Sequence, residues 1–277
     1  MADLKNKIGE FKTVPCLAIV KIGNDPDSDI YVQRKLAFAK KIGINAFIVD
    51  LAITLDGQKK EITQPALLAG IEKLNKDQTV NGIIIQSPLP EPLNWAEAVE
   101  KVAPEKDVDG LCSENVRKLL TNDKTGIVPA TARGILTLLN YYKIPLKDKK
   151  VVVMGRSALV GKPIAVLMNN NDAKVTVVHS QTPEPEKITR EADILIVAIG
   201  KPELVGADYV KEGQVIIDVG ISAVLNSDGT RKIYGDVDFE SVKDLVSAIS
   251  PVPGGVGPMT VASLFQNLVA ATTSSRH

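Results

Sequence analysis

Short apolar segments alternate with helical segments between residues 151 and 219, and this alternation restricts the fold more than any other feature of the sequence. Runs of this length that are rich in Val and Ile and bounded by turn residues are typical of buried strands. Strands joined by helical crossovers are usually parallel, and several in succession are the rhythm of a dinucleotide-binding fold. The sequence therefore predicts a parallel sheet with strands at Val151–Met154, Lys174–Val178, Asp193–Ile199 and Gln214–Val219.

The first half of the chain has the same β-α-β rhythm. Its predicted strands are Pro15–Lys21, Ala46–Leu51 and Gly82–Gln86, and its predicted helices are Ser28–Gly43, Gln64–Lys76 and Trp95–Val102. We expect an α/β protein of two domains, with residues 1–130 plus 258–277 forming an α/β catalytic domain and residues 131–257 a Rossmann-like, parallel-sheet nucleotide domain. Residues 250–258 are too rich in Pro and Gly for a helix or strand, and a closing amphipathic helix, Met259–Val269, returns to the first domain.

Capping residues indicate where two of the helices begin. Ser28 or Asp29 is a suitable N-cap for the first of them, and Gly43 stands where that helix would end. Thr131 is a suitable N-cap for a helix at residues 133–142, which leads into the second half of the chain.

Charge is balanced along the chain, with 33 basic and 33 acidic residues among 277. No basic tract dominates, so nucleic acid and anionic membrane surfaces are disfavoured as partners. No apolar run approaches the roughly 20 residues that span a bilayer, and the N-terminus has no signal-peptide core. Cys16 and Cys112 suggest no disulfide framework, and we expect a reducing, cytoplasmic setting. Since His179 and His277 are the only histidines, no metal site is expected.

Lys35 is the first candidate for chemistry, because it lies near the middle of the apolar face of its predicted helix. An ammonium held there is partly desolvated, which lowers the pKa of the lysine and makes the amine a possible proton acceptor. Tyr31 lies one turn earlier on the same side. Gln86 comes at the carboxyl end of a strand, where parallel sheets bind ligands, so Lys35 and Gln86 are predicted to face one crevice. On the helix alone, a lysine whose stem packs while its amine reaches water is the commoner case.

A phosphate-binding turn is predicted at Gly155–Gly161, which follows a strand and opens a helix. The turn lacks the full Gly-x-Gly-x-x-Gly pattern, so a purely structural turn is an equal alternative. The next strand ends in residues 179–182 without the acid that bonds the ribose 2′-hydroxyl in many NAD sites. Arg156 and Ser180 suit a 2′-phosphate, which favours NADP over NAD. The alternative is that Arg156 is a surface residue and Ser180 a turn residue.

Two further polar segments have competing interpretations. Residues 107–111, Asp-Val-Asp-Gly-Leu, show neither helical nor strand periodicity, and their composition favours a polar turn. The functional alternative is a carboxylate that holds an amino-heterocycle through paired hydrogen bonds. A single histidine beside a strand end, such as His179, is more often structural than catalytic, and Lys35 is the better candidate for a base.

Several motifs occur in a fixed order between residues 15 and 270, and together they are far more specific than any one of them. They are Tyr31-x-x-x-Lys35, Gln86-Ser-Pro-Leu-Pro90, Lys106-Asp-Val-Asp-Gly110, Gly155-Arg-Ser-x-x-Val-Gly-x-Pro163, Asp218-Val-Gly-Ile221, Gly235-Asp-Val237 and Pro251-Val-Pro-Gly-Gly-Val-Gly-Pro-Met-Thr260. With this set the sequence resembles the bifunctional methylenetetrahydrofolate dehydrogenase/cyclohydrolase family.

The resemblance implies two reactions. The first is the NADP-dependent oxidation of 5,10-methylenetetrahydrofolate to the 5,10-methenyl cation, and the second is hydrolysis of that cation to 10-formyltetrahydrofolate. By position in the motifs, Lys35 would be the catalytic lysine, Gln86 its hydrogen-bonding partner, and Tyr31 the residue that stacks on the pterin and p-aminobenzoyl part. A homodimer is also implied, with a folate as the small-molecule substrate.

The remaining site residues follow from the resemblance in the same way. Asp109 would anchor the pterin, and the folate end of the crevice would be shaped by Pro253, Gly254 and Gly255. The predicted contacts to the dinucleotide are Gly155, Arg156, Ser157, Ser180 and Ile221. Hydride transfer needs little from side chains beyond holding the two reacting carbons together, which fits a chain without a Ser-His-Asp or metal set.

The sequence also departs from the family pattern. The family usually has another strand and more helix before the first strand, residues 54–61 look like a small insertion, and Ala130 and Ala132 replace larger residues. Two other functions stay open, a monofunctional dehydrogenase of the same fold and a non-catalytic nucleotide-binding protein. Lys35 with Gln86 favours the bifunctional enzyme over the first, and the folate-side segments argue against the second.

Overall fold

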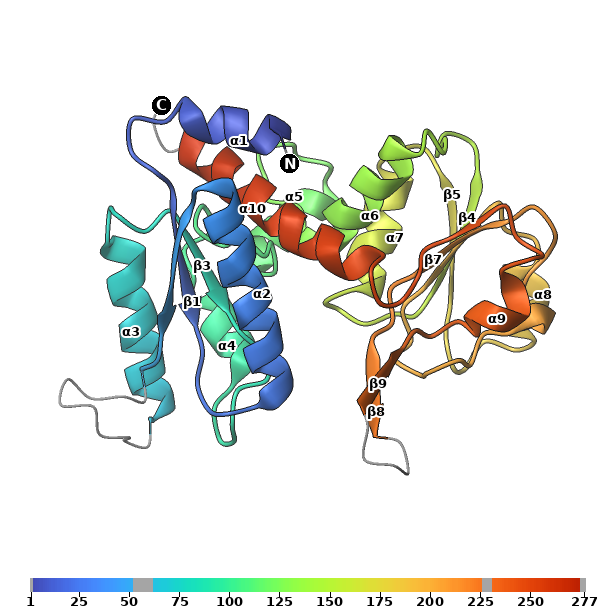
Figure 1. The fold of residues 1–277 in the computed structure, drawn as a ribbon, viewed down its shortest axis with the longest axis horizontal. Coiled ribbons are helices and arrows are strands. Elements are labelled where there is room, and N and C mark those ends of the chain that lie inside the picture. The colour runs from blue at the N-terminus through green and yellow to red at the C-terminus, as the bar shows by residue number, and fades with distance from the viewer. Residues whose placement is uncertain (1, 52–61, 226–230, 275–277) are drawn as a thin grey trace. The chain divides into compact units, whose positions relative to one another are not determined.

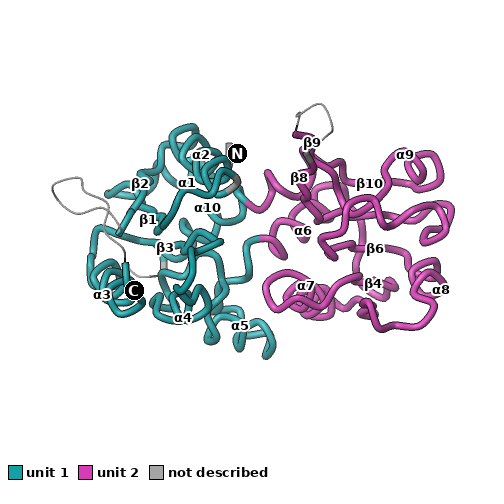
Figure 2. Tube along the Cα trace, turned by 90° about the horizontal axis from the view of Figure 1, so that it is seen from below, with its two compact units in different colours: residues 1–130, 261–277 teal, residues 131–260 magenta. Residues whose placement is uncertain are grey.

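The computed structural model describes residues 2–51, 62–225 and 231–274. The loop and insertion predicted at residues 54–61 lie outside these ranges. The chain divides into two compact units, the first formed by Met1–Ala130 and Val261–His277 and the second by Thr131–Thr260 (Figure 2). The prediction of an α/β fold with parallel sheets is confirmed.

The first unit is built on a parallel three-stranded sheet in the order β2-β1-β3 (Figure 2). Leu17 in the central strand pairs with Ala46 on one side and Gly82 on the other. The strands are β1 (Cys16–Val20), β2 (Asn45–Val49) and β3 (Gly82–Ile85), and the helices are α1 (Ala2–Gly9), α2 (Pro26–Ile42), α3 (Gln64–Lys76), α4 (Trp95–Glu100) and α5 (Ser113–Leu120).

Both faces of this sheet are covered by helices. Leu17 and Ile19 point into a core shared with α2 and with α10 (Val256–Ser274), whereas Ala18 and Val20 point into a core shared with α3 and α4. Figure 1 shows α2 and α3 on opposite sides of the strands. Strands β1 and β3 are buried on both faces, so they are continuous apolar runs, whereas the edge strand β2 keeps Phe47 and Ile48 exposed.

Helix α2 begins earlier than the sequence predicted. Its N-cap is Asp25, whose carboxylate accepts a hydrogen bond from the Ser28 amide, and Pro26 occupies the first turn. Ser28 and Asp29 are therefore inside the helix and do not cap it. The earlier start is favoured because proline is well suited to the first helical position. The predicted end is correct, since Gly43 closes the helix with a φ of 82°.

The second unit contains a parallel five-stranded sheet in the order β10-β7-β6-β4-β5. The strands are β4 (Lys150–Met154), β5 (Lys174–Val178), β6 (Ile194–Val197), β7 (Val215–Asp218) and β10 (Ala248–Ile249). The other elements are α6 (Ala130–Tyr141), α7 (Gly161–Asn169), α8 (Pro185–Thr189), η1 (Ala207–Tyr209), α9 (Phe239–Val242) and an antiparallel pair, β8 (Ser222–Leu225) and β9 (Arg231–Tyr234).

Two further boundaries differ from the predictions. Thr131 is the second residue of α6 and not its N-cap, because the helix already starts at Ala130. Helix α10 starts at Val256, so the last residues of the Pro- and Gly-rich segment at 250–258 are helical. Its single proline, Pro258, lies in the first turn, where a missing N–H costs no hydrogen bond.

The predicted return of the closing helix to the first unit is confirmed. The part of α10 after Thr260 belongs to that unit, and Phe265 stacks on Phe38 of α2 with 5.3 Å between ring centroids. The buried Asn267 amide donates hydrogen bonds of 2.9 Å to the carbonyls of Val108 and Val128. The helix thus fixes the two loops that flank the segment 109–127.

Candidate active site

Lys35 and Gln86 meet in the first unit, on one helix and at one strand end. The Lys35 Nζ donates a hydrogen bond of 3.0 Å to the Gln86 Oε1, although 51 residues separate them. Gln86 directly follows β3, and its Nε2 donates to the Ser87 carbonyl at 2.9 Å. Because that bond fixes the orientation of the amide, its oxygen is the atom turned toward the lysine.

The surroundings of Lys35 favour its neutral form. Burial of the amine lowers the pKa of Lys35 from the ordinary lysine value, and the negative charge of Asp109 opposes this by a smaller amount. Gln86 is 9% exposed and adds no charge. A carboxylate at position 86 would raise the pKa of the lysine again, so the uncharged partner preserves the amine as a proton acceptor.

The two carboxylates of the Asp-Val-Asp-Gly segment have different surroundings. Asp107 is buried and accepts hydrogen bonds from the amides of Gly110 and Cys112 and from the Asn115 side chain. Asp109 is half-buried, and burial raises its pKa, with a smaller opposite effect from the charge of Lys35. Asp107 therefore shapes the turn, while the carboxylate of Asp109 keeps its acceptor capacity for a ligand.

Tyr31 lies one turn before Lys35 on α2 and is half-buried. The Arg34 guanidinium carbon stands 5.7 Å from the centroid of its ring. Because α2 is helical through both residues, Tyr31 and Lys35 are one turn apart and lie on the same side of the helix.

The predicted phosphate turn joins β4 to α7 in the second unit. Gly155 has a φ of 124°, and a Cβ there would lie 2.1 Å from the Ala198 carbonyl oxygen, so only glycine fits. Ser157 Oγ accepts hydrogen bonds of 3.2 Å from the amides of Val160 and Gly161. Since its oxygen accepts these bonds, its own O–H can donate to an anion.

Arg156 reaches from this turn to the end of β5. Its Nη2 donates a hydrogen bond of 3.2 Å to the Gln181 side chain, and both Arg156 and Ser180 are exposed. His179 Nδ1 accepts from the Gln181 amide, which gives the histidine a structural role in this turn. A guanidinium and a hydroxyl, with no carboxylate at residues 179–182, form a corner suited to a phosphate.

The Pro251–Gly255 segment is a tight turn ahead of α10. The Gly255 amide donates a hydrogen bond of 2.8 Å to the Pro251 carbonyl oxygen, and a Cβ on Gly255 would lie 2.5 Å from that oxygen. Pro253 and Gly254 are exposed. Ile221 is 42% exposed and lies against the start of α10, where a Cβ on Gly257 would stand 3.4 Å from its Cδ1.

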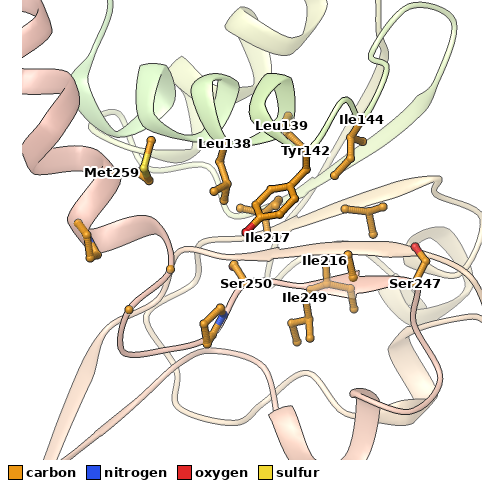
Figure 3. A pocket seen from close by; sticks show the side chains of 16 residues that line it. Leu138, Leu139, Tyr142, Ile144, Ile216, Ile217, Ser247, Ile249, Ser250 and Met259 are labelled. Atoms are coloured by element: carbon orange, nitrogen blue, oxygen red, sulfur yellow. The ribbon is translucent and has the colours of Figure 1, made fainter. Parts of the chain in front are cut away.

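A mainly apolar pocket of about 640 Å³ lies behind the same turn, between α6 and the β10–β7 edge of the sheet. Figure 3 shows Leu138, Tyr142 and Met259 on one side of it and Ile216, Ile249 and Ser250 on the other. Gly254 and Gly255 contribute to its lining, so the turn has this pocket on one of its sides.

Neither a metal cluster nor a membrane span is found in the parts of the chain that the structure describes. No three His, Cys, Asp or Glu side chains in residues 2–51, 62–225 and 231–274 are grouped to hold a metal ion. None of the helices in those ranges is long and apolar enough to cross a membrane.

Two family models match consecutive parts of this chain. The model described as "Tetrahydrofolate dehydrogenase/cyclohydrolase, catalytic domain" matches residues 1–109, and the model described as "Tetrahydrofolate dehydrogenase/cyclohydrolase, NAD(P)-binding domain" matches residues 129–276. The chain belongs to the tetrahydrofolate dehydrogenase/cyclohydrolase family. It is accordingly a bifunctional dehydrogenase and cyclohydrolase of one-carbon metabolism.

Curated and solved members of the tetrahydrofolate dehydrogenase/cyclohydrolase family are similar to this chain over nearly its whole length. The protein called "Bifunctional protein FolD" from Agathobacter rectalis is 43% identical over 97% of this chain and 93% of its own length. The crystal structure of the FolD enzyme from Campylobacter jejuni has a TM-score of 0.91 at 39% identity, covering 99% and 94% of the two chains. That of Trypanosoma brucei, solved with NADP and an inhibitor, has a TM-score of 0.90 at 35% identity, covering 100% and 94%.

The sequence motifs of the tetrahydrofolate dehydrogenase/cyclohydrolase family contain polar residues whose part in this fold the sequence did not predict. The sequence places Asp107 in a turn and gives Asp218 and Asp236 no role beyond membership of their motifs. Burial raises the pKa of Asp218 to about 6, against the lowering effect of its hydrogen bonds from backbone amides. Only Asp218 has a local signal, because it directly follows the apolar run at residues 215–217 and a carboxylate buried there needs hydrogen bonds, whereas Asp107 follows Lys106 and Asp236 follows Gly235.

Proposed function

We propose that the chain oxidises 5,10-methylenetetrahydrofolate with NADP and then hydrolyses the methenyl product to 10-formyltetrahydrofolate at a site centred on Lys35. The hydrogen bond between the Lys35 amine and the Gln86 amide oxygen carries this proposal. It pairs a lysine whose pKa is lowered by burial with a neutral acceptor, which is the combination a general base of this type requires.

In the hydrolysis, the neutral Lys35 amine accepts a proton from water as the water oxygen bonds to the methenyl carbon. The carbon–nitrogen bond to N5 then breaks as N5 takes up a proton and the new hydroxyl loses one, which leaves the formyl group on N10. Gln86 holds the amine in place through its fixed oxygen. General base catalysis of this kind contributes roughly a hundredfold to ten-thousandfold to a rate.

In the oxidation, bound NADP supplies the acceptor for the hydride that leaves the methylene carbon. Lys35 and Gln86 orient the folate for this step, Tyr31 stacks on its pterin and p-aminobenzoyl part, and Asp109 anchors the pterin by accepting hydrogen bonds. The open acceptor capacity of Asp109 supports that role. Pro253, Gly254 and Gly255 complete the folate-binding residues.

The residues of the second unit fit NADP. Gly155 gives the backbone room to approach a pyrophosphate, Ser157 has a free O–H, and Arg156 with Ser180 is suited to the 2′-phosphate. Ile221 is the remaining predicted contact. We assign folate binding and catalysis to residues 1–130 plus 258–277 and NADP binding to residues 131–257. A cytoplasmic homodimer completes the proposal, and light scattering after size exclusion measures the dimer directly.

A paired assay of both activities in Lys35→Met tests the proposed base. We expect hydrolysis of methenyltetrahydrofolate to fall at least a hundredfold, because no other amine replaces the proton acceptor. NADP binding is expected to stay at the wild-type level. Lys40→Met on the exposed side of the same helix is the matched control and should retain both activities. Wild-type hydrolysis by Lys35→Met would remove Lys35 from the mechanism.

Cofactor choice is tested by the ratio of kcat/KM values with NADP and NAD. We expect NADP to be favoured, since Arg156 can pair with the 2′-phosphate and residues 179–182 contain no carboxylate to bond the ribose. An equal ratio, or one that favours NAD, contradicts the assignment of NADP while leaving the Lys35 chemistry untouched.

A further inference from the structure

Two of the sequence motifs pack closely against each other in the second unit, and they are Asp218-Val-Gly-Ile221 and Gly235-Asp-Val237. A Cβ on Gly220 would lie 2.1 Å from the Asp236 carboxyl carbon, and a Cβ on Gly235 would lie 1.9 Å from the Asp218 Oδ2. Each motif thus supplies one buried carboxylate and one glycine that makes room for the carboxylate of the other. Neither motif is explained by the catalytic residues above.

Asp236 binds the loop that follows β6. Its Oδ2 accepts hydrogen bonds from the amides of Ile199 and Gly200 at 2.7 and 2.9 Å, and its Oδ1 accepts from the Lys201 amide at 2.8 Å. Consecutive amides that converge in this way form an anion-binding concavity, and here a carboxylate of the protein fills it. The Asp236 side chain is fully buried, so all three bonds are shielded from water.

Asp218 holds Asp236 and the end of β7 in turn. Its Oδ1 accepts from the amides of Gly220 and Asp236 at 3.1 and 3.0 Å, and its Oδ2 accepts from the Val237 amide at 3.0 Å. The backbone amide of Asp218 donates a hydrogen bond of 2.8 Å to the hydroxyl oxygen of Ser250, the residue just before the Pro251–Gly255 turn. The two carboxylates therefore connect the loops that follow β6, β7 and β9, and the backbone amide of Asp218 adds the residue that follows β10.

These loops border two of the residues predicted to touch the dinucleotide, Gly155 and Ile221. Gly155 packs against the carbonyl of Ala198, the residue just before the loop that Asp236 holds. Ile221 follows Gly220, whose amide Asp218 holds. Movement of either loop would change the space beside the phosphate turn or the position of Ile221, and neither carboxylate needs to contact the cofactor for this effect.

We propose that Asp236, supported by Asp218, is the positioning residue that gives the dinucleotide site its shape. This inference rests on the proposed NADP binding. It predicts that changes at Asp236 weaken the cofactor complex while the cofactor-independent hydrolysis, which depends on Lys35 in the first unit, continues. A purely structural role would instead lower both activities together with the folded fraction.

Asp236→Asn and Asp236→Ala form a graded pair. The Asn variant keeps an oxygen for the Ile199 and Gly200 amides but turns an NH₂ group toward the Lys201 amide, whereas the Ala variant loses all three acceptors. We expect the Kd for NADP, measured by equilibrium titration, to rise about tenfold for Asn and more for Ala. Hydrolysis of methenyltetrahydrofolate without NADP should stay within about twofold of wild type in Asp236→Asn, since Lys35 is unchanged.

Asp193→Asn is the matched control. The Asp193 carboxylate also accepts a hydrogen bond from a backbone amide, that of Lys150 at 2.8 Å. This bond lies at the amino ends of β4 and β6, the end opposite to the loop that Asp236 binds. It should bind NADP like the wild type. Where Asp236→Ala fails to fold, Asp236→Asn decides, with affinities normalised to the folded fraction.

The outcomes separate the two hypotheses. Wild-type NADP affinity in the Asp236 variants overturns the positioning role and leaves the proposed function intact. A parallel fall of NADP affinity and NADP-free hydrolysis also overturns it, because that pattern indicates general unfolding. A wild type that binds no NADP overturns the proposed cofactor, and this inference falls with it.

Discussion

The two units use polar groups in opposite ways. In the first, the groups suited to chemistry are side chains, the Lys35 amine and the Asp109 carboxylate, and each retains bonding capacity for a ligand. In the second, the carboxylates of Asp218 and Asp236 each accept three hydrogen bonds from backbone amides, and the surface suited to the cofactor is made of glycines and loops.

The difference teaches that a buried carboxylate is characterised by the donors around it. Asp107 and Asp109 stand two residues apart in one turn, yet Asp107 is buried with three donors around it, whereas Asp109 is half-buried and is coupled by charge to Lys35. A carboxylate satisfied by amides holds the fold, and one that is left underused is available to a substrate.

The largest effect is expected at the backbone-built site. Gly155→Ala should weaken NADP binding at least about a hundredfold, because its Cβ would meet the Ala198 carbonyl at 2.1 Å in a conformation unfavourable to alanine. Equilibrium titration with NADP measures the loss. Gly213→Ala is the control, with a φ of 76° but nothing within 4 Å, so it carries backbone strain without a clash. Equal NADP affinities for the two variants would contradict a site shaped by close backbone contact.

A smaller effect should separate the two carboxylates of the first unit. Asp107→Ala leaves three buried donors without an acceptor, and the free energy of unfolding should fall by about 3 kcal/mol. Asp109→Asn should change it by less than about 1 kcal/mol, because it removes a buried charge and keeps the shape of the side chain. Urea unfolding of both variants makes the comparison, and equal losses of stability would show that the two residues do not differ as described.

The smallest predicted effect is a shift in pH dependence. The negative charge of Asp109 raises the pKa of Lys35, so Asp109→Asn should lower it further. The amine must be neutral to accept a proton, so hydrolysis increases as the pH rises through this pKa and then levels off. The rising limb of kcat for hydrolysis should therefore move to lower pH in Asp109→Asn. A shift to higher pH would mean that the charge of Asp109 does not act on Lys35.

Local sequence pattern predicted the elements well where the pattern is long. Helix α3 and strand β5 begin and end at the predicted residues. Their apolar residues and the residues that flank them are close together in the sequence, so local pattern is sufficient to place both ends. The two-residue strand β10 is too short to show a period, and it exists because β7 offers it a partner. The predicted start of α2 is wrong because Ser28 and Asp29 are themselves suitable capping residues, whereas the actual cap is Asp25, just before Pro26.

Site residues were predictable only where topology placed them. The approach of Lys35 to Gln86 follows from a helix and a strand end in adjacent β-α-β units. The different bonding of Asp107 and Asp109 does not, since it depends on which side of one turn faces Asn115. Asp236 holds a loop more than 30 residues earlier in the chain, and no local period records that contact.

The bonds made by Asp218 and Asp236 also have a consequence for hydrogen exchange. The amides of Ile199, Gly200, Lys201, Gly220, Asp236 and Val237 lie outside the named strands and helices, yet each donates to a buried carboxylate. Loop amides usually exchange with solvent deuterium quickly, whereas these should exchange as slowly as those in the neighbouring strands. A deuterium map of the second unit would then show slow exchange continuing past the strand ends, into the loops that we propose shape the dinucleotide site.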